Sequence, residues 1–135
     1  MLEYVDRPEG KNVMKCGWVY EKKKGMDGED VYKARLVAKG YSQIQGMDFF
    51  EVFSPTMQVK TLRTMLAMAA NDSNVMTESW DVSTAFLHAP MDEEVYIEQP
   101  VGYEKEEKEK VCRMRKSIYG TKQASRNWHK TVHDV

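Results

Sequence analysis

The stretch Lys15–Lys39, KCGWVYEKKKGMDGEDVYKARLVAK, contains two runs of strand-forming residues separated by a turn signal. The runs are Lys15–Lys22 and Val31–Lys39, and Gly25-Met26-Asp27-Gly28 lies between them. Because Gly tolerates the backbone conformations of tight turns, this pattern predicts a β-hairpin. The hairpin is rich in Lys and Arg, which makes it a candidate for a phosphate-facing arm. A solvated strand face without a ligand is the alternative.

Downstream of the hairpin, two segments are predicted to be helical. Val59–Asn71 has apolar side chains at helical spacing and ends at Asn-Asp-Ser, so it is predicted to be an amphipathic helix. Ala124–Val132 is predicted to be a terminal helix.

Between these helices, three short strands are predicted, at Val75–Val82, Val95–Glu98 and Val111–Arg115. A bend at Ser83–Ala89 follows the first strand, and the charged run Glu104–Lys110 is predicted to be a solvated loop. Two strands, a helix, further strands and a second helix indicate an α+β fold rather than a doubly wound sheet.

The chain has 135 residues, of which 41% are hydrophobic and 30% charged, and this composition favours a single globular domain over disorder. The longest apolar run, Met65–Ala70, is far shorter than the ~20 residues of a membrane helix. With two Cys and no leader pattern at the N-terminus, we expect a soluble, intracellular protein with reduced thiols and no membrane partner. A cytoplasmic and a nuclear location both remain open.

The formal net charge is −1, so bulk charge does not indicate a nucleic-acid-binding protein. The charges are nevertheless segregated along the chain. Basic residues concentrate in Lys11–Lys24, Lys33–Lys39 and Lys110–Lys130, and acidic residues in Asp92–Glu94 and Glu104–Glu109. This pattern allows a basic face on a neutral protein.

Asp81 is the most suggestive single residue, because it follows Trp80 at the end of a predicted strand and precedes a bend. A carboxylate there could hold Mg²⁺, which prefers oxygen ligands, although a turn or helix N-cap Asp is equally typical of this position. Phe86 lies five residues later, where it could stand beside a ligand of Asp81 or fill the core.

Cys and His residues also invite a metal interpretation, but their spacing argues against it. Cys16, Cys112, His88, His129 and His133 form neither a C-x-x-C nor an H-E-x-x-H pattern. Phosphate-loop, dinucleotide and nucleophile-elbow motifs are absent from the sequence as well.

Three long phrases carry a family resemblance. Tyr32–Pro55 reads YKARLVAKGYSQIQGMDFFEVFSP, Trp80–Tyr103 reads WDVSTAFLHAPMDEEVYIEQPVGY, and Val111–Lys130 reads VCRMRKSIYGTKQASRNWHK. In this order they resemble the reverse transcriptase of copia-type long-terminal-repeat retrotransposons. The resemblance implies that residues 1–135 are one partial domain of a right-hand polymerase, comprising the fingers and the first part of the palm. A basic β-hairpin and a mixed or antiparallel sheet packed on helices would form it.

The resemblance also implies a reaction, an RNA-directed synthesis of DNA in which two Mg²⁺ (or Mn²⁺) ions assist the attack of a primer 3′-hydroxyl on a deoxynucleoside triphosphate. Asp81 matches the first metal-binding carboxylate of the family, and the carbonyl of Val82 matches an assisting ligand. Phe86 matches the aromatic side chain that crowds the 2′-hydroxyl of a ribonucleotide. An RNA or DNA template-primer is the implied partner.

Other residues are assigned to substrate contacts by the same resemblance. Lys33 and Arg35 match cations near the triphosphate, and Gln123 matches a Gln near the nucleotide and template. Contacts with nucleic acid are assigned by position to Lys39, Lys122 and Arg126.

Departures from the family pattern limit these expectations. Thr121 replaces a usual Leu and Ser125 a usual Pro, so the geometry around Gln123 is in question, and His88-Ala89-Pro90 is stiffer than usual. The family's Tyr-x-Asp-Asp hairpin, thumb and RNase H regions are not among the 135 residues. We therefore expect the isolated chain to be catalytically inactive and to bind Mg²⁺ weakly. A noncatalytic nucleic-acid-binding remnant and a non-functional relic are the alternatives.

Overall fold

Short strands, two α-helices and two 3-10 turns alternate along residues 1–107 and 109–133, which the computed structural model describes. The strands are β1 (Leu2–Val5), β2 (Val13–Met14), β3 (Cys16–Lys24), β4 (Asp30–Ala38), β5 (Tyr96–Ile97) and β6 (Val111–Met114). The helices are α1 (Val59–Ala70) and α2 (Ala124–His133), and the 3-10 turns are η1 (Gly40–Ser42) and η2 (Ala85–His88). The predicted α+β class is therefore confirmed.

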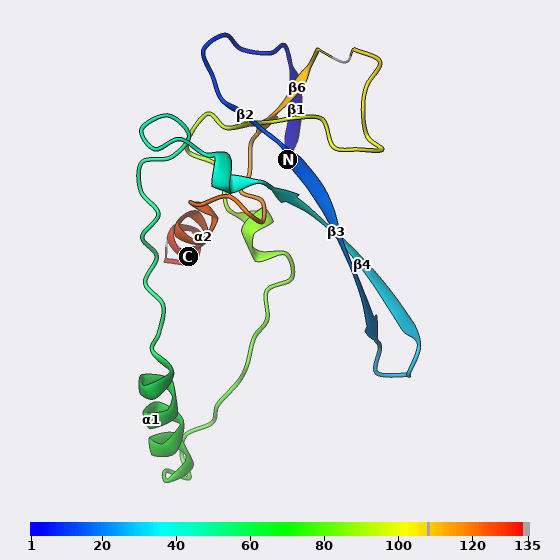
Figure 1. Ribbon diagram of the computed structural model, residues 1–135. Coiled ribbons are helices and arrows are strands. Elements are labelled where there is room, and N and C mark those ends of the chain that lie inside the picture. Colours follow the sequence, from blue (N-terminus) through cyan, green and yellow to red (C-terminus); the bar gives the residue numbers. More distant parts are fainter. Residues whose placement is uncertain (108, 134–135) are drawn as a thin grey trace.

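Two sheets form the architecture (Figure 1). The first has the strand order β1-β6-β5-β2, in which β5 pairs parallel with β2 and the other pairs are antiparallel, so it is a mixed sheet. The second is the long hairpin β3–β4, which projects away from the first sheet. Its register runs from Cys16↔Ala38 to Lys24↔Asp30, and its loop has Gly28 at φ +80°, a conformation that favours glycine.

The core lies where the four-stranded sheet meets the base of the hairpin. Its buried members come from four parts of the chain that are far apart in the sequence: Met14, Ala38, Val95, Ile97, Cys112, Met114 and Ile118. Since burial of one such side chain stabilises the fold by about 1.5–3 kcal/mol, this cluster is the main source of stability.

A close backbone contact joins the hairpin to the segment after β6. The Ala38 amide donates to the Tyr119 carbonyl at 2.9 Å. A Cβ on Gly40 would lie 2.0 Å from the Gly120 carbonyl oxygen, and Gly120 itself has φ +89°. Only glycine at both positions permits this approach.

Helix α1 lies outside this core. It stands at the far end of two extended segments, apart from both sheets and from α2 (Figure 1), and it has no buried residue. By contrast, α2 packs against η2. Among the described residues, no helix is long and apolar enough to cross a membrane.

One predicted strand is wrong. Val75–Val82 has neither helix nor strand structure, and all eight residues are exposed. A strand needs a backbone partner, and none of the described segments pairs with this one. Conversely, β1 and β2 were not predicted, because they depend on partners in β6 and β5 that lie more than 80 residues away.

Candidate functional site

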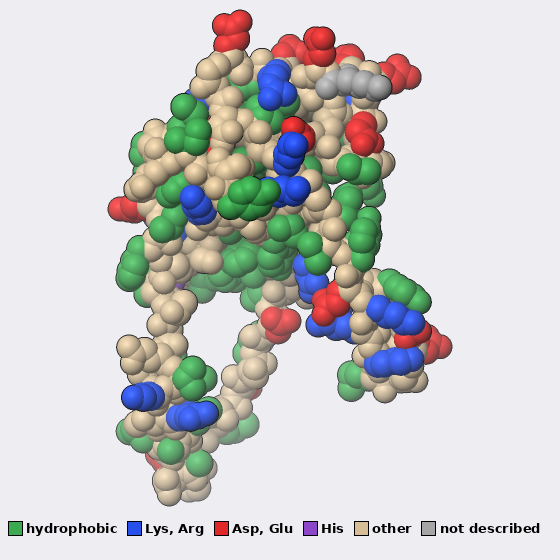
Figure 2. All heavy atoms as spheres, viewed as in Figure 1, with side chains coloured by type: hydrophobic (Ala, Val, Ile, Leu, Met, Phe, Trp, Pro, Cys, Tyr) green, Lys and Arg blue, Asp and Glu red, His purple; other side chains and the backbone are tan. Residues whose placement is uncertain are grey.

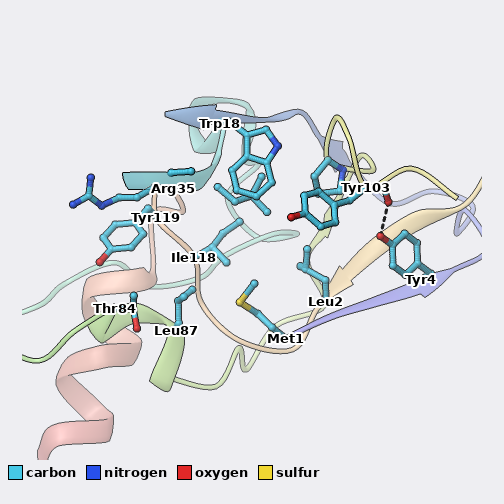
Figure 3. A pocket seen from close by; sticks show the side chains of 13 residues that line it. Met1, Leu2, Tyr4, Trp18, Arg35, Thr84, Leu87, Tyr103, Ile118 and Tyr119 are labelled. Atoms are coloured by element: carbon cyan, nitrogen blue, oxygen red, sulfur yellow. Dashed lines mark hydrogen bonds between the residues drawn. The ribbon is translucent and has the colours of Figure 1, made fainter. Parts of the chain in front are cut away.

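The base of the hairpin, η2 and the segment after β6 meet around a cavity of about 380 Å³ (Figure 3). Arg35 of β4, Thr84 before η2 and Tyr119 lie at one end of this cavity, and Trp18 and Tyr103 lie toward the other. The side chains that line the cavity are mainly apolar. They come from segments that are far apart in the sequence.

Two aromatic rings bring η2 and the post-β6 segment together at this end. The ring of Phe86 lies 5.0 Å from that of Tyr119, at an interplanar angle of 60°. Phe86 is half-buried rather than part of the closed core. The pair is a tilted aromatic contact, which is a favourable geometry for ring quadrupoles.

The backbone before η2 is unusual, because Thr84 has φ +54° in the left-handed region. A β-branched residue in this region costs roughly 1–3 kcal/mol, and such conformations cluster at functional sites. Thr84 lies between Asp81 and Phe86 in the phrase that carries the resemblance, so the strained residue falls inside the expected site.

Arg35 is held by an acidic neighbour on the adjacent strand. Its NH1 donates to Oε2 of Glu21 at 2.7 Å, and this contact raises the pKa of Arg35. The guanidinium of Arg35, followed by the ammonium of Lys23, keeps the pKa of Glu21 below its ordinary value. The ion pair is about one-third exposed, so it orients the guanidinium more than it stabilises the fold.

Acidic residues balance most of the cations on the hairpin (Figure 2). Asp30 pairs with both Lys22 and Lys24, at 2.7 and 2.8 Å, and Lys23 pairs with Glu21. Lys33, opposite Glu21 in the register, is exposed, and no ion pair is found for it within the described chain.

Three further cations were assigned to nucleic acid. Lys39, at the end of β4, is exposed, and its backbone amide donates to Lys15. Arg126 donates through Nε and NH2 to Glu51, and Lys122 donates from Nζ to the Gln43 carbonyl. The structure therefore engages Arg126 and Lys122 in intramolecular contacts, while Lys39 presents its ammonium at the surface.

Gln123 lies in a buried polar network. Its side chain is 0% exposed. Its Oε1 accepts from Nε2 of Gln43 at 2.8 Å, and its Nε2 donates to the Asp48 carbonyl at 2.9 Å. Oε1 of Gln43 in turn accepts from the backbone amide of Lys122 at 2.7 Å. Sequence reasoning did not single out Gln43, although it lies within the first family phrase, because its partners Lys122 and Gln123 are about 80 residues away in the sequence.

Near Gln123, the fold accepts the two residues that differ from the family pattern, Thr121 and Ser125. Thr121 is buried and its hydroxyl donates to the Ile118 carbonyl at 3.0 Å, so the polar group that replaces a usual Leu has a partner. Ser125 is an exposed residue in the first turn of α2.

Asp81 stands apart from these contacts. It is exposed in an irregular segment, and its neighbours Trp80 and Val82 are exposed as well. Within residues 1–107 and 109–133, no three His, Cys, Asp or Glu side chains lie close enough together to hold a metal ion. One exposed carboxylate does not by itself make a two-metal site. Cys16 and Cys112 are free thiols.

Comparison with known proteins identifies the family. Residues 1–135 match the family described as reverse transcriptase (RNA-dependent DNA polymerase), and the chain belongs to this family. It is similar to the retrovirus-related Pol polyprotein from transposon TNT 1-94 of Nicotiana tabacum, with 48% identity over 127 residues that cover 93% of the chain and 10% of that polyprotein.

Other relatives are also retrotransposon polyproteins. The Pol polyprotein from transposon RE2 of Arabidopsis thaliana is 43% identical, over 90% of the chain and 8% of the polyprotein. The transposon Ty1-DR4 Gag-Pol polyprotein of Saccharomyces cerevisiae is 37% identical, over 96% of the chain and 8% of the polyprotein. The chain thus spans a tenth or less of the length of these relatives, and no solved structure matches it. The resemblance to copia-type reverse transcriptases is confirmed.

Proposed function

We propose that residues 1–135 form one partial polymerase domain, the fingers and the first part of the palm, that helps a copia-type RNA-directed DNA polymerase hold its incoming deoxynucleoside triphosphate. One observation carries this proposal. Arg35 and Phe86, which the family resemblance assigns to the nucleotide, are 51 residues apart in the sequence, and Tyr119 links them: Tyr119 lines one end of the cavity together with Arg35, and its ring lies 5.0 Å from that of Phe86.

The proposed roles follow from charge and shape. Arg35 offers a guanidinium, already oriented by Glu21, to the triphosphate oxygens, and Lys33 adds an ammonium from the same strand. Phe86 would crowd the 2′-hydroxyl of a ribonucleotide. Gln123 would act by fixing the segment Tyr119–Lys122 through its buried amide contacts.

The template-primer, RNA or DNA, is the proposed macromolecular partner. Lys39 is the cation best presented for its phosphates. Lys122 and Arg126 would reach phosphates by exchanging their present partners, Gln43 and Glu51. An intracellular location suits this role, since deoxynucleoside triphosphates are found there.

We propose that this chain supplies some, but not all, of the ligands of a Mg²⁺ site. Asp81 and the carbonyl of Val82 are the groups that would contribute to a Mg²⁺ site, and several carboxylates must hold two such ions. Asp81 is the only one of them that the motifs identify here. We therefore propose that the 135 residues alone bind Mg²⁺ weakly and do not extend a primer.

Nucleotide binding by the isolated chain tests the proposed site. Titration with dTTP, followed by isothermal calorimetry, should show weaker binding after Arg35→Ala or Lys33→Ala. Lys60→Ala, an exposed cation in α1, is the matched control and should bind like the unaltered chain. Equal affinity for all four proteins would contradict the proposal.

Primer extension on poly(rA)/oligo(dT) with Mg²⁺ and then Mn²⁺ tests the catalytic part. We expect no extension by either the unaltered chain or Asp81→Asn. Extension that disappears in Asp81→Asn would show that further metal ligands are supplied, and the proposed inactivity would then be wrong.

A second candidate function is noncatalytic nucleic-acid binding through the hairpin. The exposed ammonium groups of Lys33 and Lys39 favour it. Such binding weakens with salt, since log K falls by about 0.9 per neutralised phosphate for each log unit on duplex DNA. A flat salt response, or binding that survives Lys33→Ala together with Arg35→Ala, would remove this candidate.

A further inference from the structure

Helix α2 has one face in the fold and another face in solvent. Ala124 and Asn127 are its buried residues. His129 and His133 are exposed and lie four residues apart, so they are neighbours on the solvent side of the helix, separated by one turn. The centroids of their imidazole rings are 6.2 Å apart, at an interplanar angle of 36°. The proposed polymerase function makes no use of this pair.

Neither imidazole is engaged by another part of the fold. Within residues 1–107 and 109–133, no hydrogen bond or ion pair is found for either ring. Each neutral ring therefore keeps one nitrogen lone pair for an outside partner. Two such nitrogens side by side are typical of a site for a metal ion, since neutral imidazole is a common metal ligand.

The charges around the pair do not exclude a cation. Arg126 and Lys130 flank the two rings along the helix, and their positive charges alone would repel a divalent ion. Both are neutralised by carboxylates, because Arg126 lies 2.6 Å from Glu51 and Lys130 lies 3.2 Å from Asp92. These two ion pairs leave no net formal charge beside the rings.

The spacing of the rings fits one shared ion. Zn–N bonds are about 2.0–2.1 Å long, so two imidazoles on one tetrahedral ion have ring centroids roughly 5 Å apart. Closing from 6.2 Å requires a shift of about 1 Å, which rotation of two exposed side chains can supply. Among the described residues, no third His, Cys, Asp or Glu lies close enough to join the pair, so water would complete the coordination. Such a site binds an ion exchangeably and is not a structural zinc centre.

The type of ligand selects the ion. Imidazole nitrogen suits Zn²⁺, Ni²⁺ and Cu²⁺, whereas Mg²⁺ prefers oxygen. Of the three, Zn²⁺ has no redox chemistry and no geometric preference from its d electrons, so a flexible surface pair can accept it. An ion at this pair is thus chemically distinct from the Mg²⁺ proposed near Asp81, which lies in an irregular segment outside α2.

We propose that His129 and His133 form an exchangeable Zn²⁺ site that clips together one turn of α2. An ion that binds the folded helix and not the unfolded chain stabilises the fold by mass action. Because α2 packs against η2, the added stability supports the segment that holds Phe86. The inference goes beyond the proposed polymerase function and does not depend on it.

Isothermal calorimetry with ZnCl₂ and the full chain tests the site. We expect saturable binding by the unaltered chain, and Mg²⁺ in excess should not displace the zinc. His129→Ala and His133→Ala should each weaken the affinity by about 10-fold or more, since even groups that only orient a metal ligand contribute that much. Both variants keep Cys16 and Cys112, so any binding through thiols would survive these changes.

A rescue variant tests the spacing of the pair. Ser125 is exposed in the first turn of α2, four residues before His129. Ser125→His in the His133→Ala background rebuilds the same spacing one turn earlier and should restore the affinity. His88→Ala is the matched control, because His88 is an exposed histidine outside the pair, and it should bind Zn²⁺ like the unaltered chain.

Thermal unfolding gives a second readout. Zn²⁺ should raise the melting temperature of the unaltered chain and of the rescue variant, but not that of either single variant. Equal Zn²⁺ affinity in the unaltered chain and both single variants would overturn the inference, because other groups would then hold the ion. A lack of saturable binding by the unaltered chain would overturn it as well. Neither result would touch the nucleotide site, which dTTP binding tests separately.

Discussion

The four-stranded sheet and helix α1 both have apolar side chains at the spacing their secondary structure requires, but they bury them differently. In β6, Val111, Cys112 and Met114 are at most 2% exposed, because β1, β5 and the base of the hairpin cover them. In α1, Leu66 is 49% exposed and no residue is buried. Local sequence can specify a helix, but only a partner surface can bury it.

The difference in burial implies a difference in the free energy that stabilises each region. Burial of one aliphatic side chain is worth about 1.5–3 kcal/mol, whereas an isolated helix of 12 residues is marginal in water. The sheet with α2 should therefore support itself, and the segment of residues 52–84, which includes α1 and Asp81, should not.

The largest effect is expected at the contact between the hairpin and the post-β6 segment. Gly40→Ala would place a Cβ 2.0 Å from the Gly120 carbonyl oxygen, so the backbones must separate. We expect a loss of about 3 kcal/mol or more in the free energy of unfolding, measured by urea denaturation. Gly17→Ala is the control, since a Cβ there meets nothing within 4 Å, and a comparable loss in Gly17→Ala would refute the steric explanation.

The two regions can be compared with one truncation in each. Ile97→Ala removes a fully buried side chain and should cost about 2–5 kcal/mol. Leu66→Ala in α1 should change the free energy of unfolding by about 0.5 kcal/mol or less, because the side chain is half exposed. Equal losses would mean that α1 is packed as firmly as the sheet.

A smaller effect is expected in the polar network. Gln123→Ala leaves the amide of Gln43 and the carbonyl of Asp48 without their present partner. An unpaired buried group costs about 1–3 kcal/mol, so thermal unfolding should show a loss of that order. Ser125→Ala, an exposed change in the next turn, should be neutral. If Gln123→Ala were equally neutral, the network would not be needed to hold Tyr119–Lys122.

The smallest effect concerns pH. Burial, and then Cys16, raises the pKa of the Cys112 thiol above its ordinary 9.0. A raised folded-state pKa means that stability is fully present below pH 9 and is lost as the pH rises through the folded value, by at most about 1.4 kcal/mol per pH unit. Urea denaturation at pH 7.5 and 10 should therefore show a smaller alkaline loss in Cys112→Val than in the unaltered chain. Identical losses would exclude this thiol as the cause.

Sequence patterns predicted the elements whose signals are local. The hairpin, α1, β6 and α2 lie within about two residues of their predicted bounds, because alternation, helical spacing and turn residues all act over short distances. The family phrases assign Arg35 and Phe86 to one nucleotide site, and this assignment stays a prediction.

The remaining features depend on contacts between distant residues. β1 exists because Leu2 pairs with Met114, and no local pattern encodes that pairing. Val75–Val82 has the composition of a strand but no partner among the described residues. Gln43 lies in a loop, and only the fold reveals that its amide bridges Gln123 and Lys122.

Amide hydrogen exchange, read by mass spectrometry on the intact chain, tests the central difference most directly. We expect the amides of β5, β6 and α2 to be protected by several orders of magnitude more than those of α1, which should exchange nearly as fast as the extended segments beside it. If residues 59–70 were protected as strongly as residues 111–114, the expected difference would be wrong, because α1 would then have a partner surface that the described residues do not provide.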